Sequence, residues 1–267
     1  MNGENFEAAA LCACASRAAG AGRPFAFEPL PDVGAMIFRF LPRGGEGLIA
    51  KTPAEWHEAC LALGAKGFGC RLPLAAADRD PPGVRVIFPE GRESVFSAKW
   101  FRGGRPGFWS VAFQETRPDA ESCPEPARGG RALLASELAA SARLAAEMGL
   151  AAYEGCFLRA RAVLEGNLPF ARKAGWPAME GDAACLFAAA FLCDVFDAEG
   201  RWSEESRGIA SRLGLLGRYD EAAARLFRAS RLAAMEAAGS VPEAAPEKPL
   251  SRPSSAFAGL LSRLRRR

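Results

Sequence analysis

Histidine and tyrosine are scarce in this sequence, which has one histidine, His57, and two tyrosines among 267 residues. A Ser-His-Asp or Cys-His nucleophile would have to use His57, and a zinc site would have only this imidazole to combine with cysteines. No companion motif surrounds it, so we expect His57 to be a surface or half-buried helix residue. The sequence therefore favours a protein without a metal ion, a cofactor or enzymatic activity.

Other common signatures of catalysis and ligand binding are also missing. The eight cysteines contain no CxxC pair at zinc-finger spacing, and most lie in apolar helical patterns, which is typical of a reducing cytoplasm. The glycine-rich segment from Gly64 to Gly69 lacks the Gly-Lys-Ser/Thr of a phosphate-binding loop. An enzyme that uses two carboxylates, such as Asp194 and Asp197, as acid and base stays an alternative. Such a pair is formed by proximity in the fold and has no fixed spacing in the sequence.

Long hydrophobic runs are absent as well. The longest strongly apolar run, residues 183–193, is far shorter than the ~18 residues of a membrane span. The apolar run at residues 8–15 is short and is preceded by Glu4 and Glu7 instead of positive charges, so we expect no signal peptide. We therefore expect a cytoplasmic location.

The net charge of +3 is distributed unevenly. Residues 251–267 contain five arginines and no acid, so the rest of the chain has a net charge of −2. The positive charge is concentrated in the tail, and the rest of the chain lacks the net positive charge that is typical of a nucleic-acid-binding protein.

Residues 1–116 are expected to form an α+β domain. An alanine-rich helix is predicted over residues 5–19, and Thr52-Pro53-Ala54-Glu55 is a capping box that predicts a helix from Pro53 to about Leu63, ended by Gly64. Alternating apolar residues and turn signals predict strands at 35–41, 47–51 and 84–88, and a hairpin that pairs 94–101 with 108–114.

The remaining chain divides by composition. Proline, glycine and charges predict a linker at 117–130, and helical periodicity then runs through 131–238, which we expect to be an all-α domain, either a helical bundle or a short helical-repeat domain. Residues 239–253 have the composition of a flexible linker, and residues 254–267 form a basic amphipathic tail.

Two amphipathic patterns within residues 203–237 predict a helical hairpin. Ile209, Leu213 and Leu216 form one stripe, and Ala222, Leu226, Ala229 and Ala233 form the other. Ser203 is the expected N-cap of the first helix, and Gly217 is expected to take the left-handed conformation that ends it.

This hairpin resembles about one tetratricopeptide repeat. The sequence Gly-Arg-Tyr-Asp-Glu-Ala begins at Gly217, and Gly217, Tyr219, Ala222 and Ala229 occupy the positions of the repeat's signature residues, with Ala210 as the small residue of its first helix. A rival resemblance is to TerB-like helical domains, through an apolar helix that leads into Asp-Ala-Glu-Gly and Ser-Glu-Glu at residues 197–205. The first resemblance implies a surface that binds a protein partner.

Apolar residues in the tail recur at helical spacing beside a cluster of arginines, which predicts an amphipathic helix with a basic end. This tail resembles the terminal membrane-targeting helices of some bacterial cell-division proteins. It is a candidate site for a membrane or a partner, and a solvated basic tail is the alternative. Its candidate residues are Phe257, Leu260, Leu261, Leu264, Arg263, Arg265, Arg266 and Arg267.

The predicted 94–114 hairpin interleaves cations with aromatic residues. Such a surface could stack bases and hold phosphates, whereas strand alternation favours aromatics that enter the core and cations that face water. The candidate nucleic-acid residues are Lys99, Trp100, Arg102, Arg105 and Trp109.

Taken together, these patterns favour a non-enzymatic adaptor or scaffold that binds an unidentified protein partner. The tail would place it at the inner face of the membrane, on an anionic lipid surface. The alternative is a nucleic-acid-associated protein that uses the aromatic and basic hairpin together with the arginine tail.

Overall fold

The computed structural model has one mixed β-sheet in its N-terminal half and helices that dominate its C-terminal half, as the sequence predicts. It describes residues 3–22, 24–42, 47–78, 80–102, 107–117, 129–169, 176–177, 179–196 and 200–239. The elements are α1 (Gly3–Ala21), β1 (Val33–Arg39), β2 (Ile49–Ala50), α2 (Pro53–Ala62), β3 (Gly67–Arg71), β4 (Gly83–Ile87), the 3-10 turn η1 (Pro89–Gly91), β5 (Glu93–Arg102), β6 (Trp109–Thr116), α3 (Gly130–Glu147), α4 (Ala151–Leu164), α5 (Gly181–Leu192), α6 (Glu204–Arg212) and α7 (Leu216–Gly239).

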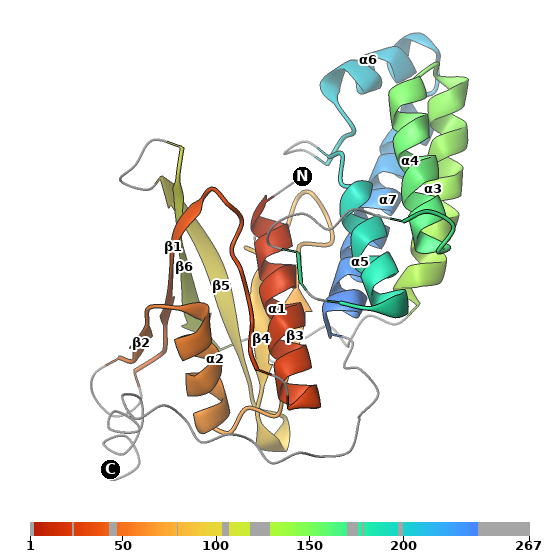
Figure 1. Ribbon diagram of the computed structural model, residues 1–267. Coiled ribbons are helices and arrows are strands. Elements are labelled where there is room, and N and C mark those ends of the chain that lie inside the picture. The colour runs from red at the N-terminus through yellow and green to blue at the C-terminus, as the bar shows by residue number, and fades with distance from the viewer. Residues whose placement is uncertain are drawn as a thin grey trace.

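The six strands lie in the order β2-β1-β6-β5-β4-β3 (Figure 1). Strands β3 to β6 form an antiparallel meander, and β6 then pairs in parallel with β1. Helices α1 and α2 cover one face, with α1 against β3, β4 and β5 and α2 against β1 and β2. The predicted strands at β1, β2 and β4 and the predicted β5–β6 hairpin are confirmed.

Strand β3 was not predicted, because Gly67 and Gly69 give its five residues little strand propensity. Its pairing with β4 over Gly67–Arg71 supplies the stabilisation that its sequence lacks. Phe68 and Cys70 alternate toward the buried face of the sheet, where α1 packs. The glycine-containing segment after α2 is therefore the edge strand of the sheet.

Helix α2 begins and ends as its capping signals predict. The Thr52 side chain accepts a hydrogen bond from the Glu55 amide at 3.2 Å, and Gly64 follows the helix with φ of 92°. The Glu55 carboxylate accepts from the amide of Lys51 at 2.7 Å, one residue before the expected N-cap donor. Trp56, fully buried on the inner side of α2, stacks on Phe38 of β1 with ring centroids 5.1 Å apart.

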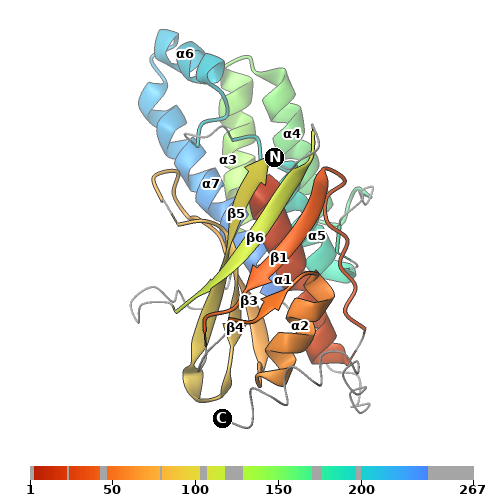
Figure 2. The ribbon, with the colours of Figure 1, turned by 90° about the vertical axis from the view of Figure 1, so that its left-hand side faces the viewer.

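Helix α1 lies between the sheet and the helical half of the molecule (Figures 1 and 2). Its residues from Phe6 to Ala15 are all buried, because α1 packs on β3 on one side and on α7 on the other. Alanine favours a helix and has no side chain beyond Cβ, so α1 can approach both layers closely. The alanine-rich run at residues 8–15 thus belongs to the central core.

Helices α3, α4, α5 and α7 form a closed bundle. Helix α3 packs on α4 and α7, and α5 packs on the same two helices, while α6 packs on α7 and lies at one end (Figure 1). The sequence left a bundle and a repeat array open, and this ring of contacts is that of a bundle. The apolar stripe of α7 is buried as predicted.

The turn between α6 and α7 lies three residues earlier than the sequence suggested. Gly214 has φ of 71° and ends α6, whereas Gly217 lies in the first turn of α7. The amide of Leu215 donates to the carbonyl of Ala210 at 2.8 Å, which is the closing hydrogen bond of a Schellman motif. Leu213 consequently points away from the core and is 52% exposed, so its place in the expected buried stripe was wrong.

One hydrophobic core runs through both halves of the molecule. Phe6 of α1 contacts Phe187 and Phe191 of α5 with ring centroids 5.8 and 5.1 Å apart, and α7 contacts β3 directly. The proposed boundary at residues 117–130 lies mostly outside the described residues and stays a prediction. The sheet and the bundle nevertheless bury their facing surfaces against each other.

Candidate functional site

The C-terminal tail lies outside the described residues. This applies to residues 240–253 of the linker predicted at 239–253, whose first residue, Gly239, is the last residue of α7, and to all eight candidate residues of the tail, from Phe257 to Arg267. Arg105 and Asp197 also lie outside them. The tail's expected role at a membrane or a partner therefore stays a prediction from the sequence.

Four candidate residues of the nucleic-acid hairpin are brought together at one end of β5 and β6. Trp100 is half-buried and packs against the core, whereas Lys99 and Arg102 are exposed. The rings of Trp100 and Trp109 meet edge to face with centroids 6.1 Å apart. The expected division into core-facing aromatics and solvent-facing cations thus holds for Trp100, but Trp109 is 37% exposed.

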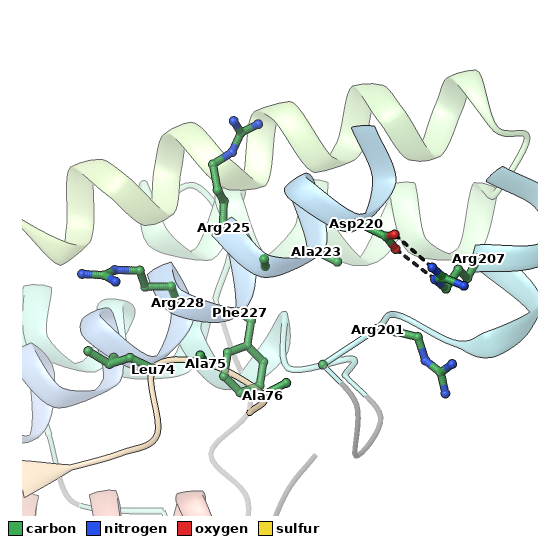
Figure 3. Close-up of a pocket in the computed structure, with 12 residues that line it drawn as sticks. Leu74, Ala75, Ala76, Arg201, Arg207, Asp220, Ala223, Arg225, Phe227 and Arg228 are labelled. Atoms are coloured by element: carbon green, nitrogen blue, oxygen red, sulfur yellow. Dashed lines mark hydrogen bonds and ion pairs between the residues drawn. The ribbon is translucent and has the colours of Figure 1, made fainter. Parts of the chain in front are cut away.

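A cavity of about 720 Å³ opens where the bundle meets a loop of the sheet (Figure 3). Its wall is the face of α7 from Asp220 to Arg228, and the loop after β3 and the chain before α6 lie opposite. A volume of this size is within the usual range of ligand sites. The cavity is lined by Leu74, Ala75, Ala76, Gly200, Arg201, Arg207, Asp220, Ala223, Ala224, Arg225, Phe227 and Arg228.

The floor of the cavity is apolar, and the chain at Gly200 packs closely against the loop after β3. The ring of Phe227 points toward the loop at Ala75 and Ala76 (Figure 3). A Cβ added at Gly200 would lie 2.6 Å from the Cβ of Ala76, and Gly200 has φ of 74°, so only glycine fits there. The loop is held by Asp78, whose carboxylate accepts hydrogen bonds from the amides of Leu74 and Ala75 at 2.8 and 2.9 Å.

Arginines surround this floor. Arg207 forms two hydrogen bonds with Asp220, at 3.0 and 3.1 Å, and Arg225 is 2.6 Å from Glu221 on the same helix. Arg228 is exposed and forms no ion pair with the part of the chain that the structure describes. With Arg201, the lining has four guanidinium groups and one carboxylate, and we call it the arginine-rimmed cavity. Arg225 is also paired with Glu137 of α3 at 3.2 Å, so the positive charge that no ion pair with a described residue balances is that of Arg228.

A buried ion pair lies next to the cavity, behind Phe227. Arg231 donates to both carboxylate oxygens of Asp194 at 3.0 and 3.1 Å, and the two side chains are 2% and 1% exposed. The guanidinium carbon is 4.8 Å from the centroid of the Phe227 ring. Asp194 was a candidate for acid/base catalysis, but this carboxylate is enclosed and neutralised, so it serves the structure.

His57 is buried, which corrects our expectation of a surface or half-buried residue. Its ring stacks on Phe25 and Phe68, with centroids 4.6 and 5.3 Å apart, and is 4% exposed. Burial lowers the pKa of His57 to about 4, although a hydrogen bond to the Ala15 backbone opposes this. The imidazole is therefore neutral at physiological pH and belongs to the contact between α2 and α1.

Glu7 of α1 is a second buried titratable group. Its carboxylate accepts a hydrogen bond from the amide of Leu30 at 2.5 Å and is 1% exposed. Burial raises the pKa of Glu7 to about 7, the Leu30 hydrogen bond opposes this, and the nearby Asp32 adds to it. Neither Glu7 nor His57 is among the residues that line the cavity beside α7, so we assign them no part in it.

Within the described segments, no three His, Cys, Asp or Glu side chains are placed to hold a metal ion, and no helix is both long and apolar enough to cross a bilayer. Comparisons with protein-family models, curated proteins and solved structures find no match. The resemblances to tetratricopeptide and TerB-like domains accordingly stay predictions from the residues that suggested them.

The cavity was not predicted from the sequence. Its lining comes from three separate segments, at residues 74–76, 200–207 and 220–228, which only the fold brings together. The one available signal was the pair Arg225 and Arg228 on the polar face of α7, and surface arginines on a helix are common.

Proposed function

We propose that this protein is a non-enzymatic adaptor that binds an acidic, amphipathic segment of a partner protein in the arginine-rimmed cavity. The observation that carries the proposal is the combination of an apolar floor at Ala223 and Phe227 with four arginines around it. Apolar side chains of a bound segment would cover the floor, and its carboxylates would meet the guanidinium groups at the rim.

The chemistry of the lining supports binding in preference to catalysis. Asp220 is the lining carboxylate, and its oxygens already accept hydrogen bonds from Arg207. The other titratable lining groups are arginines, which stay protonated and cannot exchange protons near neutral pH. The lining therefore has no evident acid/base pair, which fits a binding surface.

The proposal includes a cytoplasmic location. It is supported by the burial of Cys12, Cys60, Cys70 and Cys193, which pack as small apolar side chains. Attachment to the inner face of a membrane by the tail is a separate proposal, which depends on residues 254–267 alone.

Fluorescence anisotropy with labelled synthetic peptides tests the adaptor proposal. One peptide has leucines at helical spacing between glutamates, and its control has glutamine in place of every glutamate. We expect the acidic peptide to bind more tightly and to lose affinity as salt is raised, because exposed charges are screened. Equal binding of the two peptides, or binding of neither, would contradict the proposal.

The variant that locates the site is Arg228→Glu, because Arg228 has no ion pair to break among the described residues. We expect roughly tenfold weaker binding of the acidic peptide, or about 1.4 kcal/mol. Arg159→Glu is the matched control, since Arg159 is an exposed arginine on α4, outside the cavity. An equal loss in both variants would mean that net charge, and not the cavity, determines binding.

Nucleic-acid binding by the hairpin is the alternative function, and Trp109 and Arg102 on one side of the strand pair are the observations that favour it. Binding of labelled single strands should then weaken steeply with salt and be lost in Trp100→Ala and Trp109→Ala. Binding that survives both substitutions would reject this function for the hairpin.

A further inference from the structure

The exposed aromatic side chains of the described residues gather at one place. Phe101, Phe108 and Trp109 are 48%, 41% and 37% exposed, and the other large exposed hydrophobic residues that the structure describes are leucines or isoleucines elsewhere. All three lie at the end of β5 and β6, where this strand pair extends past α1 (Figure 1). We call Phe101, Phe108 and Trp109, with Lys99 and Arg102, the hairpin end. Exposed apolar groups that cluster in this way mark an interaction surface.

The aromatic rings of the hairpin end lie on both of its faces. Trp109 is paired with Arg102, and Phe101 is paired with Ser110, so these two pairs occupy successive positions. Successive residues of a strand point to opposite faces, which places Trp109 with Arg102 on one face and Phe101 with Lys99 on the other. Each face therefore presents at least one exposed ring and one exposed cation.

The charge of the hairpin end has one sign. No acidic residue occurs between Glu93 and Glu115 in the sequence, while Lys99 and Arg102 are both exposed. The acidic residue beside the end is Asp32, whose carbonyl accepts a hydrogen bond from the amide of Trp109 at 2.7 Å. The hairpin end thus offers aromatic rings in a surrounding of net positive charge.

We propose that the hairpin end inserts into the headgroup region of an anionic lipid bilayer. A nucleic-acid strand or a protein groove would contact one face and leave the ring on the other face in water. A bilayer entered end-on surrounds both faces at once, so Phe101 and Trp109 are both desolvated. Tryptophan favours the membrane–water interface because its ring is apolar and its N–H is polar, and anionic headgroups attract Lys99 and Arg102.

The proposal does not depend on the arginine-rimmed cavity or on the C-terminal tail. Its test is co-sedimentation of the full chain with vesicles of phosphatidylcholine alone and with added phosphatidylglycerol, at low and high salt. We expect binding to the anionic vesicles and a loss of roughly tenfold in partitioning for each ring removed in Phe101→Ser and Trp109→Ser. Leu158→Ser on α4 is the control, because Leu158 is as exposed as Phe101.

Two further variants separate the sources of binding. Lys99→Glu with Arg102→Glu keeps the rings and should abolish the preference for anionic lipid. Leu261→Glu in the tail should leave the effect of Trp109→Ser unchanged if the hairpin end binds by itself. An effect of Trp109→Ser that disappears in the Leu261→Glu background would overturn the proposal.

Tryptophan fluorescence provides a readout of insertion. Trp56 and Trp202 are buried in the core, Trp100 and Trp176 are half-buried, and Trp109 is the exposed tryptophan, so lipids brominated on their acyl chains should quench Trp109 most strongly, and Trp109→Phe should remove most of the quenching. Vesicle binding without such quenching, or vesicle binding unchanged in Phe101→Ser and Trp109→Ser, would overturn the proposal. Binding of single-stranded nucleic acid that depends on these rings, with no binding of vesicles, would assign the surface to the other partner.

Discussion

Arg231 of α7 and Asp194 after α5 form a two-point ion pair inside the protein, at 3.0 and 3.1 Å, with both side chains almost completely buried. Arg231 also lies against the Phe227 ring that forms the floor of the cavity. The pair therefore joins the helix that lines the cavity to the chain that follows α5. Because both charged groups are buried away from water, each one is stabilised mainly by the other.

Removal of one partner should be costly. We expect Asp194→Ala to lower the free energy of unfolding by about 3–5 kcal/mol, because the guanidinium of Arg231 then stays buried without a counter-ion. Urea unfolding followed by circular dichroism measures this change. The double variant Asp194→Leu and Arg231→Met should recover much of the loss, since neither charge remains.

A surface ion pair supplies the control for this experiment. Glu165→Ala removes the exposed partner of Arg161, whose nitrogen is 2.7 Å from the Glu165 carboxylate, and should change stability by less than about 1 kcal/mol. If Asp194→Ala cost no more than Glu165→Ala, the buried pair would not hold α7 in place.

Gly200→Ala should be destabilising for two reasons that can be separated. The new Cβ would lie 2.6 Å from the Cβ of Ala76, and φ of 74° is strained for any residue with a Cβ. Gly149→Ala is the matched control, because Gly149 has φ of 72° and open space around its Cβ position. We expect about 1 kcal/mol for Gly149→Ala and at least about 2 kcal/mol for Gly200→Ala.

The second site shows whether the contact with Ala76 is responsible. Ala76→Gly should recover the excess cost of Gly200→Ala over Gly149→Ala, as measured by thermal or urea unfolding of the double variant. Equal costs for the two glycine variants would mean that the loop after β3 moves aside, and that the cavity wall is not closely fitted there.

Local signals in the sequence predicted the elements that depend on local interactions. Helix α2 follows from Thr52, Pro53 and Glu55, and the pairing of β5 with β6 follows from their alternating apolar residues. Strand β3 was missed because its glycines disfavour a strand, and only β4 holds it in the sheet. The choice between Gly214 and Gly217 as the end of α6 depended on which leucines pack, and the sequence does not show this.

Of the candidate sites too, the sequence predicted those formed by residues close together in the chain and missed those formed by distant residues. The exposed rings at Trp109 and the cations at Lys99 and Arg102 were visible in the sequence, because they lie on neighbouring strands. The arginine-rimmed cavity and the burial of Arg231 were not, since arginine is normally exposed and its partner Asp194 is 37 residues away in the chain. Long-range contacts of this kind become visible only in the folded chain.

His57 should make stability depend on pH. Burial lowers the pKa of His57 to about 4 from its ordinary value of 6.5, so the unfolded chain binds the extra proton between these values. The contribution of the neutral imidazole is complete above pH 6.5 and is lost as the pH falls toward 4, by on the order of 3 kcal/mol. The difference in unfolding free energy between the wild-type protein and His57→Gln, measured in urea from pH 4 to 7, isolates this contribution and should change over this range. A difference between the two proteins that stays constant with pH would mean that His57 does not titrate in this range.

Glu7 should change the pH dependence of stability in the opposite direction, over a pH range that overlaps that of His57. Burial raises the pKa of Glu7 from 4.5 to about 7, so the folded chain holds the extra proton, and its contribution is complete below pH 4.5 and lost as the pH rises through 7. Glu7→Gln keeps an acceptor for the Leu30 amide and should raise stability above pH 7 by on the order of 3 kcal/mol.

Because the two groups oppose each other, the wild-type protein should show a shallow profile between pH 4.5 and 6.5. Glu7→Gln should then reveal the full loss of stability on acidification that His57 causes, and His57→Gln should reveal the gain that Glu7 causes. The double variant should again be nearly flat, since neither titrating group remains. Unfolding curves for all four proteins at matched pH test this cancellation, and parallel profiles for the wild-type protein and both single variants would contradict it.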